Sequence, residues 1–459
     1  MTGPRVVRVA AGQGFWGDDQ DAPVRQVEGG PIDYLMLDYL AEVTMSIMQK
    51  QRAKDPRAGY ARDFVALMER IFPACVEKGI RVVSNAGGVN PRACADALVE
   101  AARRAGVGGR ARVALVTGDD LIDRLDALLD AGHPLANLDT GAPLSSVRDR
   151  VQSANAYIGA RPIVAALGHR PTVVVTGRVA DAALTYAPLI HEFGWSWDDH
   201  DRISSGVVAG HINECGAQAT GGNAMAEWWT IPDLARVGFP IIEAEASGAF
   251  VVTKHPGSGG RVDRRTVTEQ IVYEIGDPRA YITPDAVADF TSIQLDEVGP
   301  DRVRVHGVTG RSAPEMLKVS IAYADGWKAF GTLTYAWPDA VAKARAAAAV
   351  LVERLDRLGL RFDALRTELV GWSSTHGHLA GEPPADLPEV QLRVGVRGHD
   401  LQAVERFTRE IAPLVLTGPP SVTGFAGGRP RVQEVMAYWP ALIRRDAVEP
   451  WLQVEVLEA

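Results

Sequence analysis

Cysteine, excess positive charge and long apolar runs are all scarce in this chain. Its 459 residues include three cysteines, Cys75, Cys94 and Cys215, and no Cys-x-x-Cys pair. This usage excludes a disulfide framework and a zinc finger. Lys and Arg number 48 against 57 Asp and Glu, which gives a net charge of −9. That balance argues against nucleic acid or an anionic membrane as a partner.

Apolar residues nowhere form the run of about 20 that a membrane span needs. The first residues, MTGPRVVRVAAGQG, lack the apolar centre of a secretory signal. The few cysteines are typical of a reducing compartment, so we expect a cytoplasmic protein. The length predicts two or three domains.

Short β-branched runs alternate with helical patterns over residues 1–285. The runs RVVRVA, GIRVVS, ARVALVT and TVVVT each lead into a turn rich in Gly, Asn or Asp and then into spaced apolar residues. Strands that alternate with helices in this way usually form a parallel sheet covered on both faces. We therefore predict an α/β domain over 1–285, with a mostly parallel sheet and helices on both faces.

The remaining residues, 286–459, predict a smaller α+β domain. The stretch EMLKVSIAYADGWKAFGTLTYAW indicates two antiparallel strands with ADGW as the hairpin turn. An Ala- and Leu-rich helix is expected over 338–360, where a Pro opens it and a Gly closes it. GEPPADLPE, at 381–389, is typical of a linker, and a helix is expected from Leu401 to about Leu416.

Five polar, Gly-rich turns follow the predicted strands. They are GQGFWGDD, SNAGGVNP, TGDD, TGRVAD and TKHPGSGG. Ligands of open parallel sheets bind at the carboxyl ends of the strands, so these turns predict one shared cleft. The alternative is that each turn is an ordinary connection between a strand and a helix, without a role in binding.

His211 and Glu214 stand in the densest polar stretch, SSGVVAGHINECGAQATGGN, where Cys215 adjoins them. Three residues apart, they share a face of a helix. Acid–base chemistry is one interpretation, with Glu214 orienting the imidazole of His211. A metal site would need a third ligand, and a polar helix packed under a loop is the simplest alternative.

Two further acidic pairs have two interpretations each. Asp38 and Glu42 lie four apart in IDYLMLDYLAEVTMSIM, predicted to be an apolar helix; they either mark its one wet stripe or face the cleft with raised pKa values. Asp119 and Asp120 are cleft carboxylates or helix caps.

Arg178 and Asp181 in TGRVAD are three residues apart. They form either an anion-binding Arg held by a carboxylate or an exposed ion pair at a helix start.

The turn TKHPGSGG has neither the order of a P-loop nor that of a dinucleotide-binding fingerprint. Free backbone N–H groups near a cation nevertheless favour a phosphate or carboxylate. The predicted anion-binding residues here are Lys254, His255, Gly257, Ser258, Gly259 and Gly260. A separate metal hypothesis rests on His376 and His378, which alternate as strand ligands do.

The chain resembles the acyclic terpene utilisation AtuA family over nearly its whole length. The motifs that carry the resemblance are GFWGDD, VEGGPIDYLMLDYLAEVTM, DPRAGYARDF, GIRVVSNAGGVNP, GHINECGAQATGGN and GFPIIEAEASGAFVVTKHPGSGG. The resemblance implies a place beside enzymes that degrade branched terpenoids as coenzyme A thioesters. It supplies no catalytic residues.

We therefore predict an enzyme acting on a branched acyl-CoA or related carboxylate, as a hydro-lyase or carbon–carbon lyase. His211 is the predicted base, with Glu214 as its partner or as a second acid. Donors of the turn at Asn85, Gly87 and Gly88 are expected to stabilise an enolate, and Arg178 to bind an anion. The alternatives are a metal-dependent hydrolase and a non-catalytic subunit of an acyl-CoA enzyme complex. We expect no cofactor beyond the coenzyme A of the substrate, although a divalent metal is left open as an alternative. We also expect a homo-oligomer.

Overall fold

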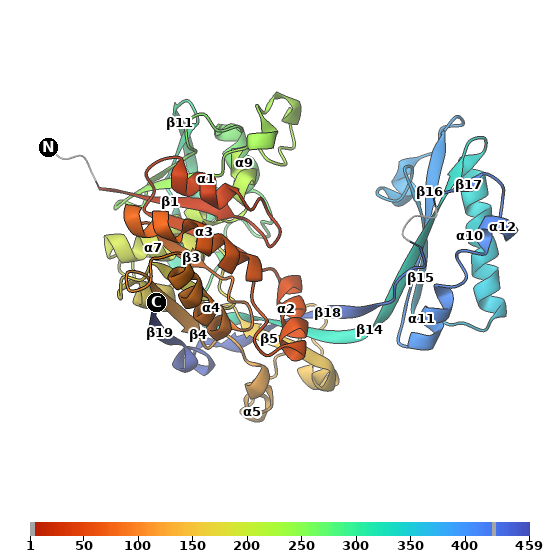
Figure 1. Cartoon of the computed structure of the whole chain (residues 1–459), viewed down its shortest axis with the longest axis horizontal. Coiled ribbons are helices and arrows are strands. Elements are labelled where there is room, and N and C mark those ends of the chain that lie inside the picture. The colour runs from red at the N-terminus through yellow and green to blue at the C-terminus, as the bar shows by residue number, and fades with distance from the viewer. Residues whose placement is uncertain (1–4, 425–427) are drawn as a thin grey trace. The chain divides into compact units, whose positions relative to one another are not determined.

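The computed structural model describes residues 5–424 and 428–459, which form two compact units (Figure 1). Unit 1 comprises Met1–Ala322 and Tyr438–Ala459, and unit 2 comprises Tyr323–Ala437. This division differs from the predicted one at residue 285, because strands on both sides of that residue pair within one sheet of unit 1. Unit 2 is thus an insertion between two parts of unit 1.

Unit 1 is built on a ten-stranded sheet in the order β11-β12-β8-β7-β1-β2-β3-β6-β4-β19. The bounds are β11 Gln294–Gly299, β12 Arg302–His306, β8 Phe250–Thr253, β7 Ile241–Glu245, β1 Val6–Gln13, β2 Tyr34–Leu37, β3 Arg81–Ser84, β6 Val173–Thr176, β4 Arg112–Thr117 and β19 Gln453–Glu458. A smaller sheet in the order β13-β10-β9 joins Thr309–Ser312, Ala286–Asp289 and Tyr281–Ile282.

The large sheet is mixed, which corrects the prediction of a mostly parallel one. Only the five central strands β1, β2, β3, β6 and β4 run parallel to one another. The flanking pairs are antiparallel: β7 with β1, β8 with β7, β12 with β8, β11 with β12, and β19 with β4. Direct connections from β7 to β8 and from β11 to β12 have no room for a crossover helix, so these strands must reverse direction.

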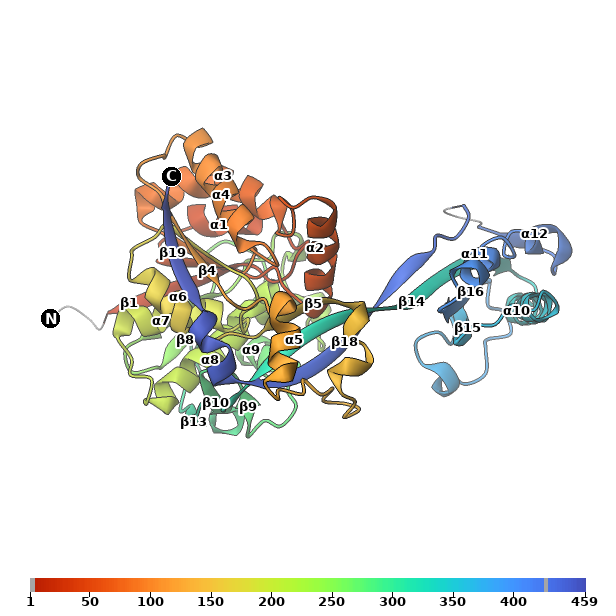
Figure 2. The same ribbon diagram turned by 90° about the horizontal axis from the view of Figure 1, so that it is seen from below.

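Helices cover both faces of the parallel centre, as predicted. Figure 2 shows α1, α3 and α4 on one side of the sheet and α6, α7 and α8 on the other. The bounds are α1 Ala22–Glu28, α2 Glu42–Lys54, α3 Arg62–Lys78, α4 Pro91–Arg104, α5 Leu125–Asp130, α6 Arg161–Leu167, α7 Ala183–Phe193, α8 His200–Glu214 and α9 Arg264–Ile271. Strands buried on both faces read as continuous apolar runs, as VVVT of β6 does.

The predicted helix around Asp38 is wrong, and the error matters for the site. Residues Tyr34–Leu37 form β2, and α2 begins only at Glu42. The letters YLML are buried on both sides in the sheet, so they carry no alternation that would tell a strand from a buried helix. Asp38 therefore lies at the carboxyl end of a central parallel strand.

Unit 2 has the order strand, helix, two strands, helix, strand, with a sheet ordered β15-β16-β14-β17. This is the split βαβ arrangement of ferredoxin-like folds. The bounds are β14 Met316–Ala336, α10 Ala340–Arg357, β15 Ala364–Val370, β16 Glu389–Gly398, α11 Leu401–Phe407, α12 Leu414–Thr417, β17 Val422–Thr423 and β18 Gln433–Arg444. Strand β14 begins in unit 1, and β5 (Val151–Ala156) and β18 also pair with it.

Three predictions for the carboxyl-terminal part need correction. ADGW is not a hairpin turn, because β14 runs through it without reversing. Gly326 has φ of +83° there, and a Cβ atom on it would lie 2.7 Å from the carbonyl oxygen of Gly398, so this glycine permits a close strand approach. GEPPADLPE joins β15 to β16 inside unit 2 and is not a linker between units. The helix expected over 401–416 is broken into α11 and α12, with Pro413 at the start of the second.

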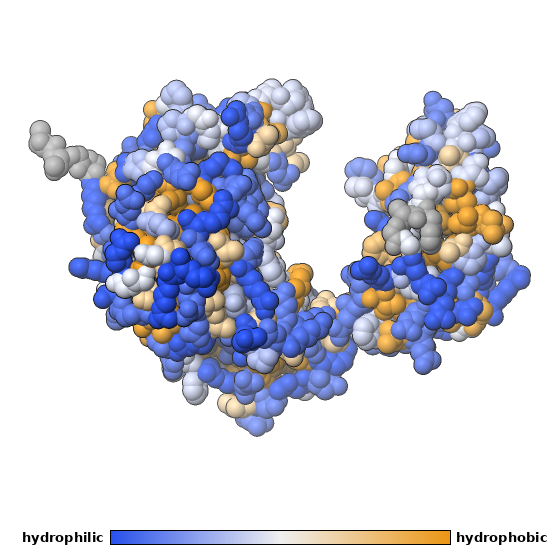
Figure 3. All heavy atoms as spheres, in the orientation of Figure 1, coloured by the Kyte–Doolittle hydropathy of each residue, from blue (hydrophilic) through white to orange (hydrophobic). Residues whose placement is uncertain are grey.

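The visible surface in Figure 3 is mostly hydrophilic, with apolar side chains in separate patches. None of the helices in the described part of the chain is long and apolar enough to cross a membrane.

Candidate active site

Polar side chains from four neighbouring parallel strands meet at the carboxyl edge of the large sheet. Asp38 follows β2, Asn85 follows β3, Asp119 follows β4 and Arg178 follows β6. All four are almost fully buried. Three of the five predicted turns therefore meet at this edge, and Asp38 joins them because β2 is a strand. Their four side chains are packed in the interior.

Arg178 is the hub of this cluster, with only 2% of its surface exposed. Its Nη1 donates to the Leu40 carbonyl at 2.9 Å, and the guanidinium binds both carboxylate oxygens of Asp181 at 2.8 and 3.3 Å. The guanidinium also stacks over the ring of Tyr157, 4.2 Å from its centroid. Neither interpretation from the sequence fits fully. Arg178 does pair with Asp181, but the guanidinium is buried while 32% of the Asp181 side chain is exposed. Both terminal nitrogens of Arg178 already have partners inside the protein.

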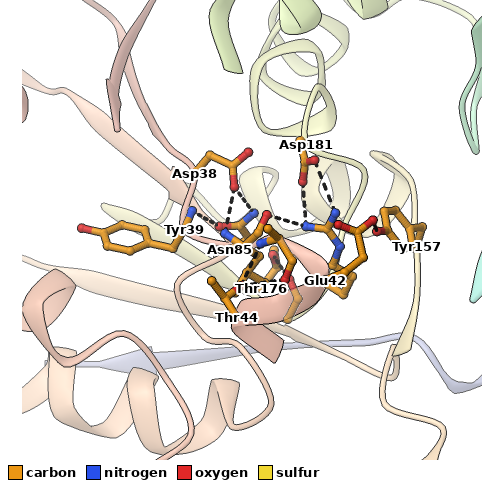
Figure 4. Close-up of polar contacts among 12 residues, drawn as sticks. Asp38, Tyr39, Glu42, Thr44, Asn85, Tyr157, Thr176 and Asp181 are labelled. Carbon is orange, nitrogen blue, oxygen red and sulfur yellow. Dashed lines mark hydrogen bonds and ion pairs between the residues drawn. The ribbon is translucent and has the colours of Figure 1, made fainter. Parts of the chain in front are cut away.

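Asn85 links two of the loops through its side chain (Figure 4). Its Oδ1 accepts a hydrogen bond from the Tyr39 backbone N–H at 2.7 Å, and its Nδ2 donates to Asp38 Oδ1 at 2.7 Å. Burial raises the pKa of Asp38, and this outweighs the lowering by Arg178 and Asn85. Burial likewise raises the pKa of Asp181, against the charge of Arg178. Asp38 and Asp181 therefore hold a proton at a higher pH than surface carboxyls do.

The turn after β3 is tightly packed against its neighbours. Gly88 N–H donates to the Asn85 carbonyl at 3.1 Å. A Cβ on Gly87 would lie 2.5 Å from the Thr176 carbonyl oxygen, and one on Gly88 2.2 Å from Met48 Sδ. These glycines let the turn pack closely against its neighbours. The Gly88 N–H is used inside the turn, and the enolate-binding role of Asn85, Gly87 and Gly88 stays a prediction.

Glu42, Tyr157 and Lys318 form a second part of the cluster. Tyr157 donates its hydroxyl hydrogen to Glu42 Oε1, and Lys318 Nζ lies 3.3 Å from the same oxygen. Burial alone would raise the pKa of Glu42, but the bond from Tyr157 and the charge of Arg178 outweigh it and lower the pKa to about 2. Glu42 is therefore a permanent anion that holds Tyr157 and Lys318 in place.

His211 and Glu214 do pair on one face of α8, as predicted. His211 Nδ1 lies 3.0 Å from Glu214 Oε1, and Nε2 lies 2.9 Å from the Gln270 carbonyl oxygen. A carbonyl can only accept, so Nε2 carries a hydrogen, and a second hydrogen must lie between Nδ1 and the carboxylate. Burial lowers the pKa of His211, but Glu214 and the carbonyl acceptor outweigh it and raise the pKa overall.

Glu214, rather than His211, faces the pocket. The pocket has a volume of about 240 Å³ and is lined by Tyr157, Ala180, Asp181, Ala182, Glu214, Tyr281, Ile282, Thr283, Pro284, Pro314, Met316, Leu317 and Lys318. Glu214 Oε2 is buried and has no hydrogen-bond partner among the described residues. His211 is 1% exposed, and both its ring nitrogens are engaged, so it lies behind Glu214 as a positioning residue.

Asp119 and Asp120 have different roles. Asp119 Oδ2 accepts from the Arg178 backbone N–H at 2.8 Å and from Asn155 Nδ2 at 2.9 Å, so it is a buried connector and not a cap. Asp120 Oδ1 accepts from the Ile122 N–H at 3.0 Å. It is not a cap either, because the 3₁₀ helix Ile122–Arg124 has Leu121 at its N-cap position. Burial, with the nearby charge of Asp120, raises the pKa of Asp119 to about 7.

Asp119→Asn is expected to remove a pH dependence of stability. The amide oxygen still accepts hydrogen bonds but has no charge to bury. The folded protein keeps a proton on Asp119 up to about pH 7, whereas the unfolded chain releases it near its ordinary value of 3.8. Between pH 5 and 7 the wild type should therefore lose roughly 1 kcal/mol per pH unit relative to the variant. Urea unfolding across this range measures it, and parallel pH slopes would refute the assignment.

The TKHPGSGG turn lies at the same sheet edge, beyond β7, but its donors are used inside the protein. Lys254 Nζ donates to the Ser258 carbonyl at 2.9 Å and pairs with Asp301 at 3.1 Å. The N–H groups of Ser258, Gly259 and Gly260 donate to the carbonyls of His255, Arg236 and Pro232. The predicted anion cradle therefore has neither a free cation at Lys254 nor free donors at these three residues.

His255 packs against α1 instead of the cluster around Arg178. Its Nε2 lies 3.0 Å from the Gln26 carbonyl oxygen, and burial lowers its pKa. With Gly257 and Ser258 it borders a separate pocket of about 320 Å³ beside Gly29. Lys254 does not line that pocket.

Lys254→Met is expected to lower stability and to leave ligand binding unchanged in the pocket that Glu214 faces. The side chain is 4% exposed and holds both Asp301 and its own turn. Loss of charged hydrogen bonds of this kind costs about 1.5–3 kcal/mol. Thermal unfolding of Lys254→Met and of the exposed control Lys54→Met measures the difference. Equal melting temperatures would contradict the structural role.

The remaining candidates lie apart. His376 and His378 are exposed and sit on a 3₁₀ turn, Gly377–Ala380, of unit 2, so the alternation expected for strand ligands does not apply. Among residues 5–424 and 428–459 no group of three or more His, Cys, Asp and Glu side chains is arranged to hold a metal ion. Burial raises the pKa of Cys215 to about 12, so its thiol is no ready nucleophile.

Three pocket residues escaped the sequence reasoning: Tyr157, Tyr281 and Lys318. Each stands in or beside a short strand of ordinary composition. Lys318 belongs to the alternating run MLKVS, where a lysine normally faces solvent. No local signal marks any of them as a site residue.

Comparison with known proteins settles the family. The model of the acyclic terpene utilisation family protein AtuA matches residues 7–454. The chain belongs to the AtuA family. Membership in this family implies a role in acyclic terpene utilisation. No curated protein and no solved structure matches the chain.

Proposed function

We propose that this AtuA family member is a lyase acting on a branched acyl thioester of coenzyme A, with Glu214 as the group that moves the proton. The observation that carries the proposal is the pocket oxygen Glu214 Oε2, which is buried and without a partner among the described residues. A carboxylate held from behind by His211 and open toward a largely apolar pocket is suited to general acid–base catalysis.

Two other pocket groups supply what an elimination needs. Glu214 takes the proton from the carbon next to the thioester carbonyl, and the charge that develops on the carbonyl oxygen is stabilised by the ammonium of Lys318. Asp181, whose pKa is raised, gives its proton to the hydroxyl leaving from the next carbon. The products are an unsaturated thioester and water. Proton return from Glu214 to Asp181 restores the enzyme.

The pocket's size and lining favour the acyl part of such a substrate. Ala180, Met316 and Leu317 are among its apolar walls, and its volume is about 240 Å³. Sites for whole drug-sized ligands are larger, about 300–1,000 Å³. The pocket therefore suits a branched acyl group rather than a complete thioester.

Exchange of the α-hydrogen tests the proposal without knowledge of the exact substrate. Protein is incubated in D₂O with branched and linear acyl-CoA thioesters and with the matching free acids, and deuterium at the α-carbon is followed by mass spectrometry. We expect incorporation with branched thioesters. No incorporation with any thioester, together with no thermal stabilisation by them, would overturn the proposal.

A second candidate, a non-catalytic subunit of an acyl-CoA enzyme complex, is favoured by one observation. Four large apolar side chains are exposed within a short segment of unit 1: Met225 (82%), Trp228 (56%), Trp229 (69%) and Leu234 (43%). Such a patch is typical of protein contacts. This candidate predicts that the protein alone exchanges no hydrogen but changes the rate of a purified acyl-CoA enzyme.

A further inference from the structure

Among the described residues of unit 2, no α-helix packs on one of the two faces of its sheet. On the covered face, strand residues such as Leu333, Tyr335 and Val394 pack against α10 and α11 in one apolar core. Figure 1 shows α10 and α12 on one side of these strands. Because side chains alternate along a strand, the residues between them point to the opposite side. We call this side the open face; its central residues are Lys328, Phe330, Ala364, Arg366, Glu368, Arg393, Gly395 and Arg397.

Strand register leaves a hollow at the middle of the open face. Phe330 of β14 is paired with Gly395 of β16, which is paired in turn with Arg366 of β15. The central position of this row has no side chain. The result is a pocket of about 570 Å³ lined by all the central residues of the open face. Phe330 stands at its side with 52% of its surface exposed.

The charges around the hollow do not cancel. Arg393 pairs with Glu368 at 2.6 Å, and Arg397 forms an ion pair with Asp325. Lys328 and Arg366 are exposed and have no ion-pair partner within the described ranges. The open face therefore presents two available cations, an exposed aromatic ring and an empty floor at Gly395.

We propose that the open face binds an adenine nucleotide, either free or as the nucleotide end of coenzyme A. The purine ring would stack on Phe330 above Gly395, because bases stack on aromatic side chains without needing a fixed sequence. The phosphates would lie against Lys328 and Arg366. The volume is in the range of small-molecule sites. A longer nucleic acid is disfavoured by the net charge of −9 and by the small number of available cations.

Calorimetric titration of the full-length protein with ADP, coenzyme A and adenosine tests the inference. We expect ADP and coenzyme A to bind at least tenfold more tightly than adenosine, since adenosine has no phosphate. Phe330→Ala and the pair Lys328→Gln with Arg366→Gln should each weaken ADP binding at least tenfold. Arg409→Gln, which removes an exposed cation between α11 and α12, is the matched control and should bind as the wild type does. Melting temperatures confirm that the variants fold.

The outcomes separate this inference from its rivals and from the proposed function. No heat with ADP or coenzyme A would overturn it. Tighter binding of a ten-residue oligothymidine than of ADP would also overturn it. A Phe330→Ala variant that changes the oligomeric state but not ADP binding would overturn it as well, because the open face would then be a contact between copies of the chain. The inference does not rest on the proposed chemistry: ADP binding without hydrogen exchange would uphold it while the lyase proposal fails. If coenzyme A binds more tightly than ADP, the natural ligand of the open face is the nucleotide end of a coenzyme A thioester rather than a free nucleotide.

Discussion

Glu214→Gln is expected to lower kcat for α-hydrogen exchange by about 10²–10⁴-fold, the usual contribution of a general base or acid. The amide cannot accept the substrate proton, yet the fold should persist. The new side-chain N–H₂ can donate to the Nδ1 of a neutral His211, while His211 Nε2 still donates to the Gln270 carbonyl. Exchange rates by mass spectrometry and melting temperatures of both proteins check the two halves of this expectation.

The control for Glu214→Gln is Glu100→Gln, which changes an exposed carboxylate of α4 that pairs only with Arg103. It should leave exchange and stability as they are. A Glu214→Gln protein that folds and works within threefold of the wild-type rate would remove Glu214 from the chemistry.

Arg178→Met is expected to cost about 1.5–3 kcal/mol of unfolding free energy, because it removes the charged hydrogen bonds of a buried guanidinium. The variant leaves the Leu40 carbonyl without its donor and Asp181 without its counter-charge. The methionine chain fills part of the volume, so the loss reports mainly the missing charge. Urea unfolding at neutral pH measures it.

Arg202→Met supplies the comparison, since Arg202 makes a similar i, i+3 pair with Asp199 but is 46% exposed. Exposed pairs of this kind are worth less than about 1 kcal/mol. The double variant Arg178→Met with Asp181→Leu should recover part of the lost stability, because no carboxylate is then left without its cationic partner. If Arg178→Met proves as stable as Arg202→Met, Arg178 contributes no more to stability than an exposed arginine does.

The parts of the fold that follow from local pattern were predictable. The runs at β1, β3, β4 and β6 were identified as strands, and the helix α10 as a helix, because their composition and their flanking Gly and Pro residues agree with their structure. The antiparallel edges and the return of β19 to the large sheet depend on pairings distant in sequence, which no local signal specifies. Gly326 shows the same limit: a glycine suited to a turn also suits a close approach within a strand.

For the site, residue chemistry was easier to predict than residue surroundings. The pairs His211–Glu214 and Arg178–Asp181 are both present, since three-residue spacing on a helix or turn is a local property. Which member faces the pocket depends on how α8 lies against Gln270 and Tyr281, and no spacing reveals that. The TKHPGSGG turn is misleading because a glycine-rich sequence indicates accessible backbone N–H groups. It does not show which carbonyl oxygens elsewhere in the fold accept hydrogen bonds from them.

Strand β19 has a consequence for how the protein is made. Its partner β4 ends at Thr117, and β19 itself starts only at Gln453, so roughly 300 residues are synthesised before that edge is closed. At about 5–20 residues per second, β4 stays an open edge for on the order of 20–60 s on the ribosome. Open edges recruit other strands, and unit 2 is produced during this wait. A nascent chain stopped before residue 453 is therefore the species most exposed to aggregation and most in need of a chaperone.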